Sequence, residues 1–409
     1  MFLTLAVKSL LHRKVAVSLS VIAMSVSVFA LLGVEHARHQ IKDNFYNTVS
    51  GVDLIVGSRT SSINLLLYSV FRVGSPTRNI KHERYEELLA DENIKWSVPI
   101  SLGDSHDGFR VVGTIPAYFD KIKFGKKKDL SFSSGRSFAE PFELVLGSEV
   151  SSALGYKLGD QITLSHGISE STFLEHKNFP FTVTGILEAT GTPIDRALYV
   201  GLSGLELIHM PPNQVRQSIK ELDKGVPIKV DEITAVMLGL ENRLTTFKIQ
   251  EKINRFQKEP LIAVIPGVAL SELWQMVRLL ENSLQLVTIL VFVAACLGLS
   301  AMLLSSIRER HKEIQLLRII GAPSIFLFLL IELESLLITL ISIFIGMFFL
   351  SFSIFLLQDF LVSSFTMSIT PNIFNRDTTR ILVILIVAAF VTSIVPSFLA
   401  YRSSKNLVI

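Results

Sequence analysis

Two glutamates in an otherwise apolar segment, Glu332 and Glu334, are the first candidates for chemistry. Ionisable side chains within a membrane helix are costly and often functional, for example as proton carriers. They follow Pro323 by only a few turns, near the expected membrane interface, where water or lipid headgroups could reach them. Two residues apart on a helix, they should point to nearly opposite sides. Because the other apolar segments offer no ionisable partner, we expect a helix or subunit junction here and no proton relay.

Other motifs give little support for catalysis. No Walker A sequence occurs, since Gly125-Lys126 is followed by lysine and lacks the first glycine, and HExxH, CxxC and GxSxG are absent. The segment 104–107 (Asp-Ser-His-Asp) could ligate zinc, but its flanking glycines favour a polar turn. His36 and His39 share a helix face, and we interpret them as surface histidines. We expect no enzyme activity, bound cofactor or metal in this chain.

The composition excludes two further classes. The formal net charge is +3, and no dense basic patch with interleaved aromatic residues indicates nucleic-acid binding. The single cysteine, Cys296, lies in an apolar block, so an intramolecular disulfide is impossible.

Crossing a bilayer as a helix takes about 20 apolar residues. Four segments qualify: 15–34, 282–307, 323–358 and 381–401. The first could be a signal peptide, since basic residues precede it. However, its apolar run is longer than a signal core and no clear cleavage site follows, so we expect it to be retained as an anchor.

Lysine and arginine near the four segments predict the orientation. They precede the first segment, lie between the second and third, and follow the fourth, which puts all three groups on one side. We therefore expect the amphipathic N-terminus (1–14), the loop 308–322 and the tail 402–409 in the cytoplasm. The large domain (35–281) and the loop 359–380 are then extracytoplasmic.

The large domain is predicted to be mixed α/β, giving a four-helix membrane protein with an α/β domain between helices one and two. Helical patterns at 35–49 and 270–284 suggest stalks that continue the membrane helices. Further helices are expected at 82–90 and 241–258. Strands are expected at 51–57, 95–99, 109–114, 144–146, 161–164, 179–187 and 197–200, with serine-rich loops at 58–62 and 131–137.

The motifs of this domain follow a recognisable order. The segment 112–119 (VGTIPAYF) precedes 134–138 (SGRSF), 144–149 (LVLGSE), 158–160 (LGD), 181–187 (FTVTGIL) and 197–200 (ALYV). This order resembles the extracytoplasmic core domain of MacB/FtsX-type ABC transporter permeases. Four of its glycines, Gly135, Gly147, Gly159 and Gly185, are each expected to end or turn a strand with positive φ.

The membrane half resembles the same family. The run 308–323 (RERHKEIQLLRIIGAP), followed by Glu332 and Gly346, is similar to the family's cytoplasmic loop and third span. With the order of one helix, a large domain and three helices, the resemblance covers nearly the whole chain. It implies a docking loop for an ATPase, whose residues are Arg308, Glu309, Arg310, Glu313, Arg318 and Gly321, and a helix junction at Pro323, Glu332 and Gly346.

The resemblance implies the permease subunit of an ABC transporter of the type VII, mechanotransmission class, in the bacterial cytoplasmic (inner) membrane. ATP and Mg²⁺ would be bound by a separate cytoplasmic ATPase subunit. Further expected partners are a second permease copy or paralogue, the lipid bilayer, and an extracytoplasmic adaptor or substrate protein. The movements would drive export or extraction of a lipoprotein, peptide or drug.

Two alternatives stay open. The chain could signal to an extracytoplasmic partner, such as a cell-wall hydrolase, without moving cargo. It could also be an independent receptor or a secondary transporter, although the family motifs weigh against a receptor and the missing membrane-depth charges weigh against a secondary transporter. The segments 53–62 and 74–80 depart from the family pattern and suggest a subgroup with its own cargo or partner, but we favour a glycine- and serine-rich loop beside a strand there.

Overall fold

The computed structural model describes residues 2–48, 50–166, 179–222, 224–309, 322–365 and 373–406. They divide into two compact units. The helical unit comprises Met1–Gln40, Arg278–Asp359 and Ile369–Ile409, and the α/β unit comprises Ile41–Val277 and Phe360–Ser368.

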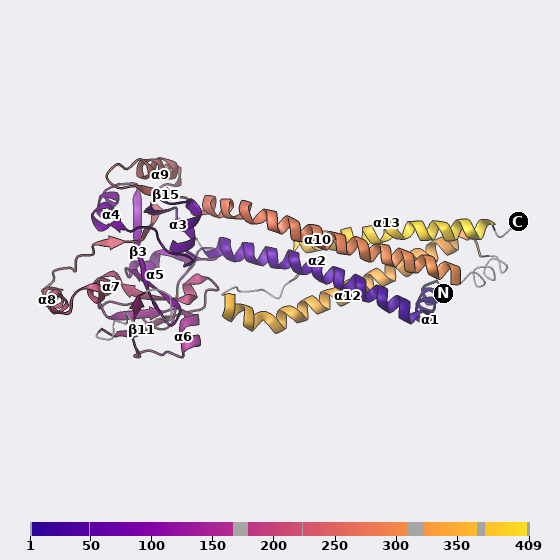
Figure 1. Ribbon diagram of the computed structural model, residues 1–409, viewed down its shortest axis with the longest axis horizontal. Helices are drawn as coiled ribbons and strands as arrows, with labels where there is room; N and C mark the ends of the chain where they lie inside the picture. The colour runs from indigo at the N-terminus through magenta and orange to yellow at the C-terminus, as the bar shows by residue number, and fades with distance from the viewer. Residues whose placement is uncertain are drawn as a thin grey trace. The chain divides into compact units, whose positions relative to one another are not determined.

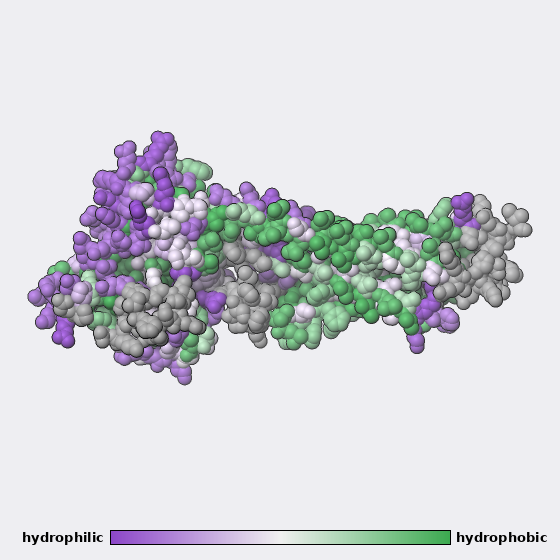
Figure 2. Space-filling model, in the orientation of Figure 1, coloured by the Kyte–Doolittle hydropathy of each residue, from purple (hydrophilic) through white to green (hydrophobic). Residues whose placement is uncertain are grey.

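Within the described residues, the helical unit contains one short helix and the greater part of four long ones (Figure 1). Their bounds are α1 (Phe2–His12), α2 (Lys14–Thr48), α10 (Pro266–Glu309), α12 (Ser324–Phe365) and α13 (Arg376–Asn406). The parts with the length and composition of membrane spans are Lys14–Gln40, Pro266–Ser305, Ser324–Leu357 and Arg376–Arg402. Apolar side chains cover much of their visible surface in Figure 2, as expected for helices whose outer faces contact lipid.

Small side chains let α2 and α12 approach closely. A Cβ added to Gly346 would lie 2.9 Å from the Ser25 carbonyl oxygen and from Val28, so no side chain fits there without movement. One turn earlier on α12, Ser342 donates a hydrogen bond to the Val21 carbonyl at 3.3 Å. This use of small residues at a helix crossing is typical of membrane bundles.

The α/β unit is organised around one large mixed sheet, with strand order β15-β1-β14-β3-β4-β12-β8-β11-β7. The pairs β4–β12 and β8–β11 are parallel and the other neighbours are antiparallel. The strands of this path are β1 (Leu54–Ser58), β3 (Ile94–His106), β4 (Phe109–Thr114), β7 (Phe132–Gly135), β8 (Glu143–Leu146), β11 (Phe181–Leu187), β12 (Ala197–Gly201), β14 (Ala235–Leu240) and β15 (Leu261–Val264). Short strands complete the unit: β2 (Ile80–Lys81), β5 (Lys123–Phe124), β6 (Lys128–Asp129), β9 (Gln161–Ile162), β10 (Ser165–His166) and β13 (Glu232–Ile233).

Helices cover both faces of the sheet, which explains why strands such as β1 and β12 are buried at every position. One face packs on α3 (Ser62–Ser69) and α5 (Ala117–Lys121), and the other packs on α4 (His82–Leu89), α9 (Thr246–Asn254), α6 (Ser148–Leu154) and α7 (Leu202–His209). A further helix, α8 (Pro212–Leu222), is amphipathic and buries Val215.

One expected loop has regular structure. The serine-rich segment predicted as a loop at 131–137 contains the edge strand β7, whose side chains alternate without a buried face. The loop favoured beside a strand at 53–62 and 74–80 is confirmed, since residues 59–61 and 74–79 lie outside helices and strands and adjoin β1 and β2. Between these two segments lies α3, which is capped by Ser61 and buries Leu65, Leu66 and Tyr68 in the core. Gly57 on β1 permits this packing, since an added Cβ would lie 2.5 Å from Leu65 Cδ1.

Candidate coupling site

The predicted docking loop is only partly described. Arg308 and Glu309 are the last residues of α10. The other predicted docking residues, Arg310, Glu313, Arg318 and Gly321, lie outside the described residues. The structure therefore defines the two borders of the loop, the end of α10 and the start of α12.

Pro323 lies directly before the first residue of α12. Its carbonyl accepts a hydrogen bond from the Phe326 N–H at 2.9 Å, which begins the helix. A proline suits a helix start because it has no N–H to leave unpaired and its φ is already near the helical value. The residue thus fixes where the apolar helix follows the loop.

Glu334 is the most completely bonded polar group in this region. Its side chain is 2% exposed, and Oε2 lies 3.3 Å from Arg13 Nη2. Oε1 accepts a short hydrogen bond from the Ser9 hydroxyl of α1. Arg13, itself 10% exposed, lies in the turn that separates α1 from α2. One buried ion pair therefore joins the N-terminal segment to α12, about three turns beyond the loop border.

Glu332 faces a different helix. Its Oε2 accepts a hydrogen bond from Ser393 Oγ of α13 at 2.7 Å, and the residue is 5% exposed. Among the residues that the structure describes, Oε1 has no hydrogen-bond partner. The two glutamates thus contact different neighbours, in agreement with their two-residue spacing.

One expectation for the glutamates is wrong. The sequence suggested that water or headgroups would reach them, but both are buried by protein. Both glutamates also have polar partners that the sequence did not suggest. Arg13 lies just before the first apolar segment and therefore outside it, and Ser9 and Ser393 contribute hydroxyl groups, which are not ionisable. A search limited to ionisable residues within the spans could not find them.

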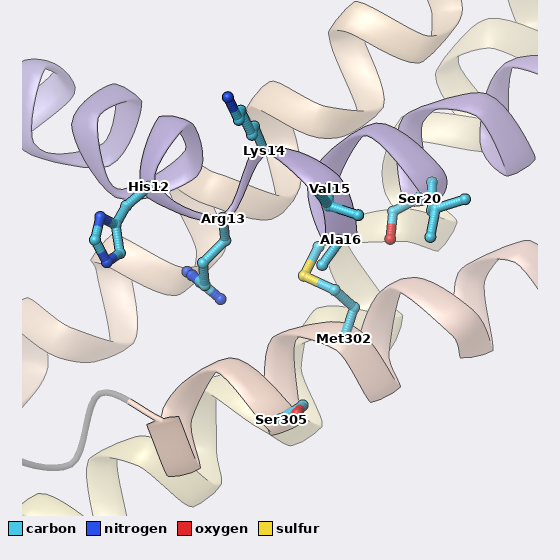
Figure 3. Close-up of a pocket in the computed structure, with 9 residues that line it drawn as sticks. His12, Arg13, Lys14, Val15, Ala16, Ser20, Met302 and Ser305 are labelled. Carbon is cyan, nitrogen blue, oxygen red and sulfur yellow. The ribbon is translucent and has the colours of Figure 1, made fainter.

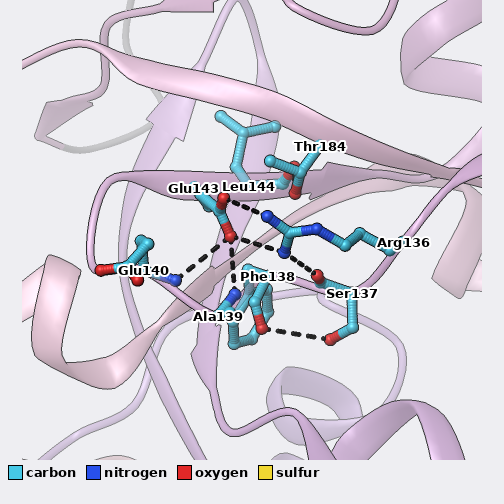
Figure 4. Close-up of polar contacts among 8 residues, drawn as sticks. All are labelled: Arg136, Ser137, Phe138, Ala139, Glu140, Glu143, Leu144 and Thr184. Atoms are coloured by element: carbon cyan, nitrogen blue, oxygen red, sulfur yellow. Dashed lines mark hydrogen bonds and ion pairs between the residues drawn. The ribbon is translucent and has the colours of Figure 1, made fainter.

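In the α/β unit, Arg136 of the SGRSF motif holds a carboxylate (Figure 4). Its two terminal nitrogens bind the two oxygens of Glu143 at 2.9 and 2.6 Å, and the backbone N–H groups of Ala139 and Glu140 donate to Oε2 at 2.7 and 3.1 Å. The hydrogen bond from Arg136 lowers the pKa of Glu143. The motif closes the turn between β7 and β8, which is a structural role.

The motif glycines have two different roles. Gly135 and Gly159 adopt positive φ, 78° and 89°, as expected. Gly147 has a φ of −65°, and Gly185 lies within β11, so the prediction of positive φ is wrong for both. Close approach of the backbone requires glycine at both positions. A Cβ added to Gly147 would lie 2.3 Å from the Asp195 carbonyl oxygen, and one added to Gly185 would lie 2.2 Å from the Arg136 carbonyl oxygen.

The expected polar turn at 104–107 is mostly strand. Asp104 and His106 belong to β3, and the turn is confined to Asp107 and Gly108. Asp104 is buried and its Oδ2 lies 3.2 Å from Nε2 of His209, on α7. The hydrogen bond with Asp104 raises the pKa of His209. Across the described residues, no group of three or more His, Cys, Asp or Glu side chains is arranged to hold a metal ion.

Comparisons with known proteins define the class. The profile of the MacB-like periplasmic core domain matches residues 16–254, and that of the FtsX-like permease C-terminal region matches residues 286–405. The chain therefore belongs to the MacB/FtsX-type permease family, the membrane component of ABC-type transporters. Membership implies a multi-pass protein of the inner membrane with an ABC ATPase as partner, and the family's membrane subunits are generally not catalytic.

Two solved structures are similar to about half of the chain. The periplasmic region of MacB from Actinobacillus actinomycetemcomitans is 12% identical with a TM-score of 0.34, covering 55% of this chain and 94% of that one. The extracellular domain of the noncanonic ABC-type transporter YknZ from Gram-positive bacteria is 13% identical with a TM-score of 0.29, covering 52% and 98%. No curated protein sequence matches the chain significantly.

Proposed function

We propose that this permease converts ATP hydrolysis by a separate subunit into movement of its α/β unit, and thereby drives export or extraction of a substrate outside the cytoplasm. The ATPase docks on the cytoplasmic loop 308–321, through Arg308, Arg310 and Arg318, with Glu309, Glu313 and Gly321 completing the surface. Both termini are then cytoplasmic, because basic residues flank the same ends of the spans.

The buried Arg13–Glu334 pair is the observation that carries this proposal. It connects α12, the helix that follows the docking loop, to α1 and to the start of α2. A displacement of the docking loop is therefore transmitted to α2 as well as to α12. The α2 helix is unbroken to Thr48, and α10 is unbroken from Pro266, which supports their role as stalks.

Charge reversal in the loop tests the docking step. The permease and its ATPase are purified together, and Arg308→Glu, Arg310→Glu and Arg318→Glu are combined in one variant. We expect lost co-purification or strongly reduced ATP turnover, because like charges would face the docking partner. The matched control reverses three exposed lysines of the α/β unit, Lys126, Lys127 and Lys128. Unchanged turnover in the loop variant would overturn the proposed coupling.

Signalling without cargo is the second candidate, since the same movement could switch an extracytoplasmic partner. Photocrosslinkers placed in cells at 53–80 and 95–240 separate the two. A released small molecule, peptide or lipoprotein among the products favours transport, whereas a stable hydrolase or other enzyme favours signalling.

A further inference from the structure

A surface cavity of about 600 Å³ lies in the helical unit where α1 meets α2 (Figure 3). Its polar end is formed by three successive basic residues, His12, Arg13 and Lys14. Its wall continues over apolar side chains of α2 and of the facing helix α10, namely Val15, Leu19 and Met302. Figure 3 shows Met302 reaching from α10 toward Val15 and Ala16.

The position of the cavity matches a membrane interface. Lys14 is the first residue of one apolar span and Ser305 is the last of another, and both line the cavity. The hydrocarbon core of the bilayer therefore ends, and the lipid headgroups begin, at the depth of this cavity. Val15 and Leu19 are 69% and 64% exposed in the protein, so a lipid chain can lie directly against them.

The ionisable side chains at the polar end of the cavity are all basic. None of the described residues that line the cavity is acidic. Arg13 already pairs with Glu334, but its contacts with Glu334 and Ser9 are both made by Nη2, which leaves Nε and Nη1 directed elsewhere. His12 and Lys14 are exposed. Lys14 points away from Met302 in Figure 3, and its long flexible stem allows the ammonium to turn to a headgroup at the mouth.

We propose that this cavity binds an anionic phospholipid, with its phosphate at His12, Arg13 and Lys14 and an acyl chain along Val15, Leu19 and Met302. Basic pockets between membrane helices bind anionic headgroups in this way. Such a lipid would occupy the junction that the Arg13–Glu334 pair holds together. The inference goes beyond the proposed coupling, and its test requires neither ATP nor the partner subunit.

Two other occupants fit the cavity less well. In a twofold dimer the same patch meets itself, so a second copy would place the Lys14 ammonium opposite the same cation. A water-soluble partner could contact the basic end, but Val15 and Leu19 lie within the apolar span, where a polar protein surface would be desolvated. A lipid satisfies both ends of the cavity.

Native mass spectrometry of the full chain in a neutral detergent tests the proposal. The protein is given equal amounts of phosphatidylglycerol and phosphatidylcholine with identical acyl chains. We expect wild type to retain the anionic lipid in preference. The variant combining His12→Gln and Lys14→Gln should bind it more weakly, by about fivefold for the loss of the Lys14 ammonium. Lys8→Gln is the matched control, because Lys8 is an exposed cation of α1 that does not line the cavity.

A second variant tests the apolar wall without changing charge. Met302→Trp should fill the cavity and displace the acyl chain, whereas Met276→Trp, on the same helix but outside the cavity, should retain the lipid. If the charge variant does not fold, the comparison of these two tryptophan variants still tests whether the lipid occupies the cavity.

Several results would overturn the proposal. Equal retention of both lipids by wild type, or an equal loss in Lys8→Gln, would indicate general surface attraction. Displacement of the lipid by millimolar glycerol phosphate would identify a site for the phosphate alone. A change in the monomer–dimer ratio of the cavity variants, with lipid retention unaltered, would identify an interface between copies.

Discussion

Two arginine–glutamate pairs, one chosen from each unit, lie where chain segments meet, and they differ in their surroundings. In the helical unit, Arg13 and Glu334 are 10% and 2% exposed. In the α/β unit, Arg136 and Glu143 are 58% and 14% exposed. The first pair joins residues 321 positions apart in the chain, and the second joins residues seven apart.

This difference teaches what each pair can do. A buried pair adds little net stability over a well-packed apolar pair, but loss of one partner leaves a charge without water or counter-ion. It therefore specifies which helices meet. A half-exposed pair is screened by solvent, so its removal costs less and affects mainly the local turn.

The largest effect is expected for the buried pair. Arg13→Ala or Glu334→Ala should each lower the free energy of unfolding by about 3–5 kcal/mol, because the remaining charge stays buried. Thermal or denaturant unfolding in detergent measures this. The double variant Arg13→Met with Glu334→Leu should recover most of the loss. The exposed pair of Lys95 and Glu241 provides the control, since Glu241→Ala should be nearly neutral. A single substitution costing under about 1 kcal/mol would refute the assignment of a buried ion pair.

Close packing in the helical unit predicts the next effect. Gly346→Ala should cost about 1–3 kcal/mol, since its Cβ would meet the Ser25 backbone oxygen at 2.9 Å and α2 would have to shift. Gly298 on α10 has nothing within 4 Å of an added Cβ, so Gly298→Ala should be neutral or stabilising through helix propensity. Similar melting temperatures for the two variants would show that α2 and α12 do not require this contact.

The half-exposed pair should respond less and depend on pH. Glu143→Gln should cost about 1–2 kcal/mol at neutral pH, since a hydrogen bond to a charged group is lost but partly screened. The pKa of Glu143 is lowered from its ordinary value of 4.5, so its contribution is present above that value and is lost as pH falls through the lower folded pKa. Unfolding of both proteins across this range should show the difference narrowing at acidic pH. A constant difference would contradict the role of the charge.

The sequence was sufficient for features that depend on composition. Long apolar segments with few or no charges predicted the four long apolar helices, because a span requires only length and apolarity. Strand β4 was predicted with its observed bounds, since apolar residues there are bounded by turns. The fold class followed from these elements and from the family resemblance.

Features that depend on tertiary contacts could not be predicted. The edge strand β7 has no buried face, so its sequence shows no alternation. The apolar run in α3 spans too few residues to distinguish a helix from a strand. Ser61, whose hydroxyl accepts a hydrogen bond from the Asn64 N–H, was nevertheless a usable capping signal. The Arg13–Glu334 contact has no local signature, because it forms only when α1 and α12 pack together.

A third ion pair, between His209 and Asp104, extends the comparison to a pair whose cation can lose its charge. Arginine stays charged over the accessible pH range, whereas histidine does not. His209 is 36% exposed and pairs with Asp104, which is 1% exposed, and this hydrogen bond raises the pKa of His209. A raised folded pKa means that the stabilisation is fully present below the ordinary value of 6.5 and is lost as pH rises through the folded value. His209→Gln should therefore cost up to about 1 kcal/mol near pH 5.5 and little at pH 9, given the solvent screening.

Melting temperatures of wild type and His209→Gln at both pH values measure this smallest effect. Arg243, whose Nε lies 3.4 Å from Asp53, supplies the control, because arginine keeps its charge at both pH values and Arg243→Gln should cost the same at each. A larger destabilisation at pH 9 than at pH 5.5 would mean that the neutral imidazole is the stabilising form. Asp104 would then resemble Glu332, a buried carboxyl bonded to a neutral donor, and not Glu334 with its permanent cation.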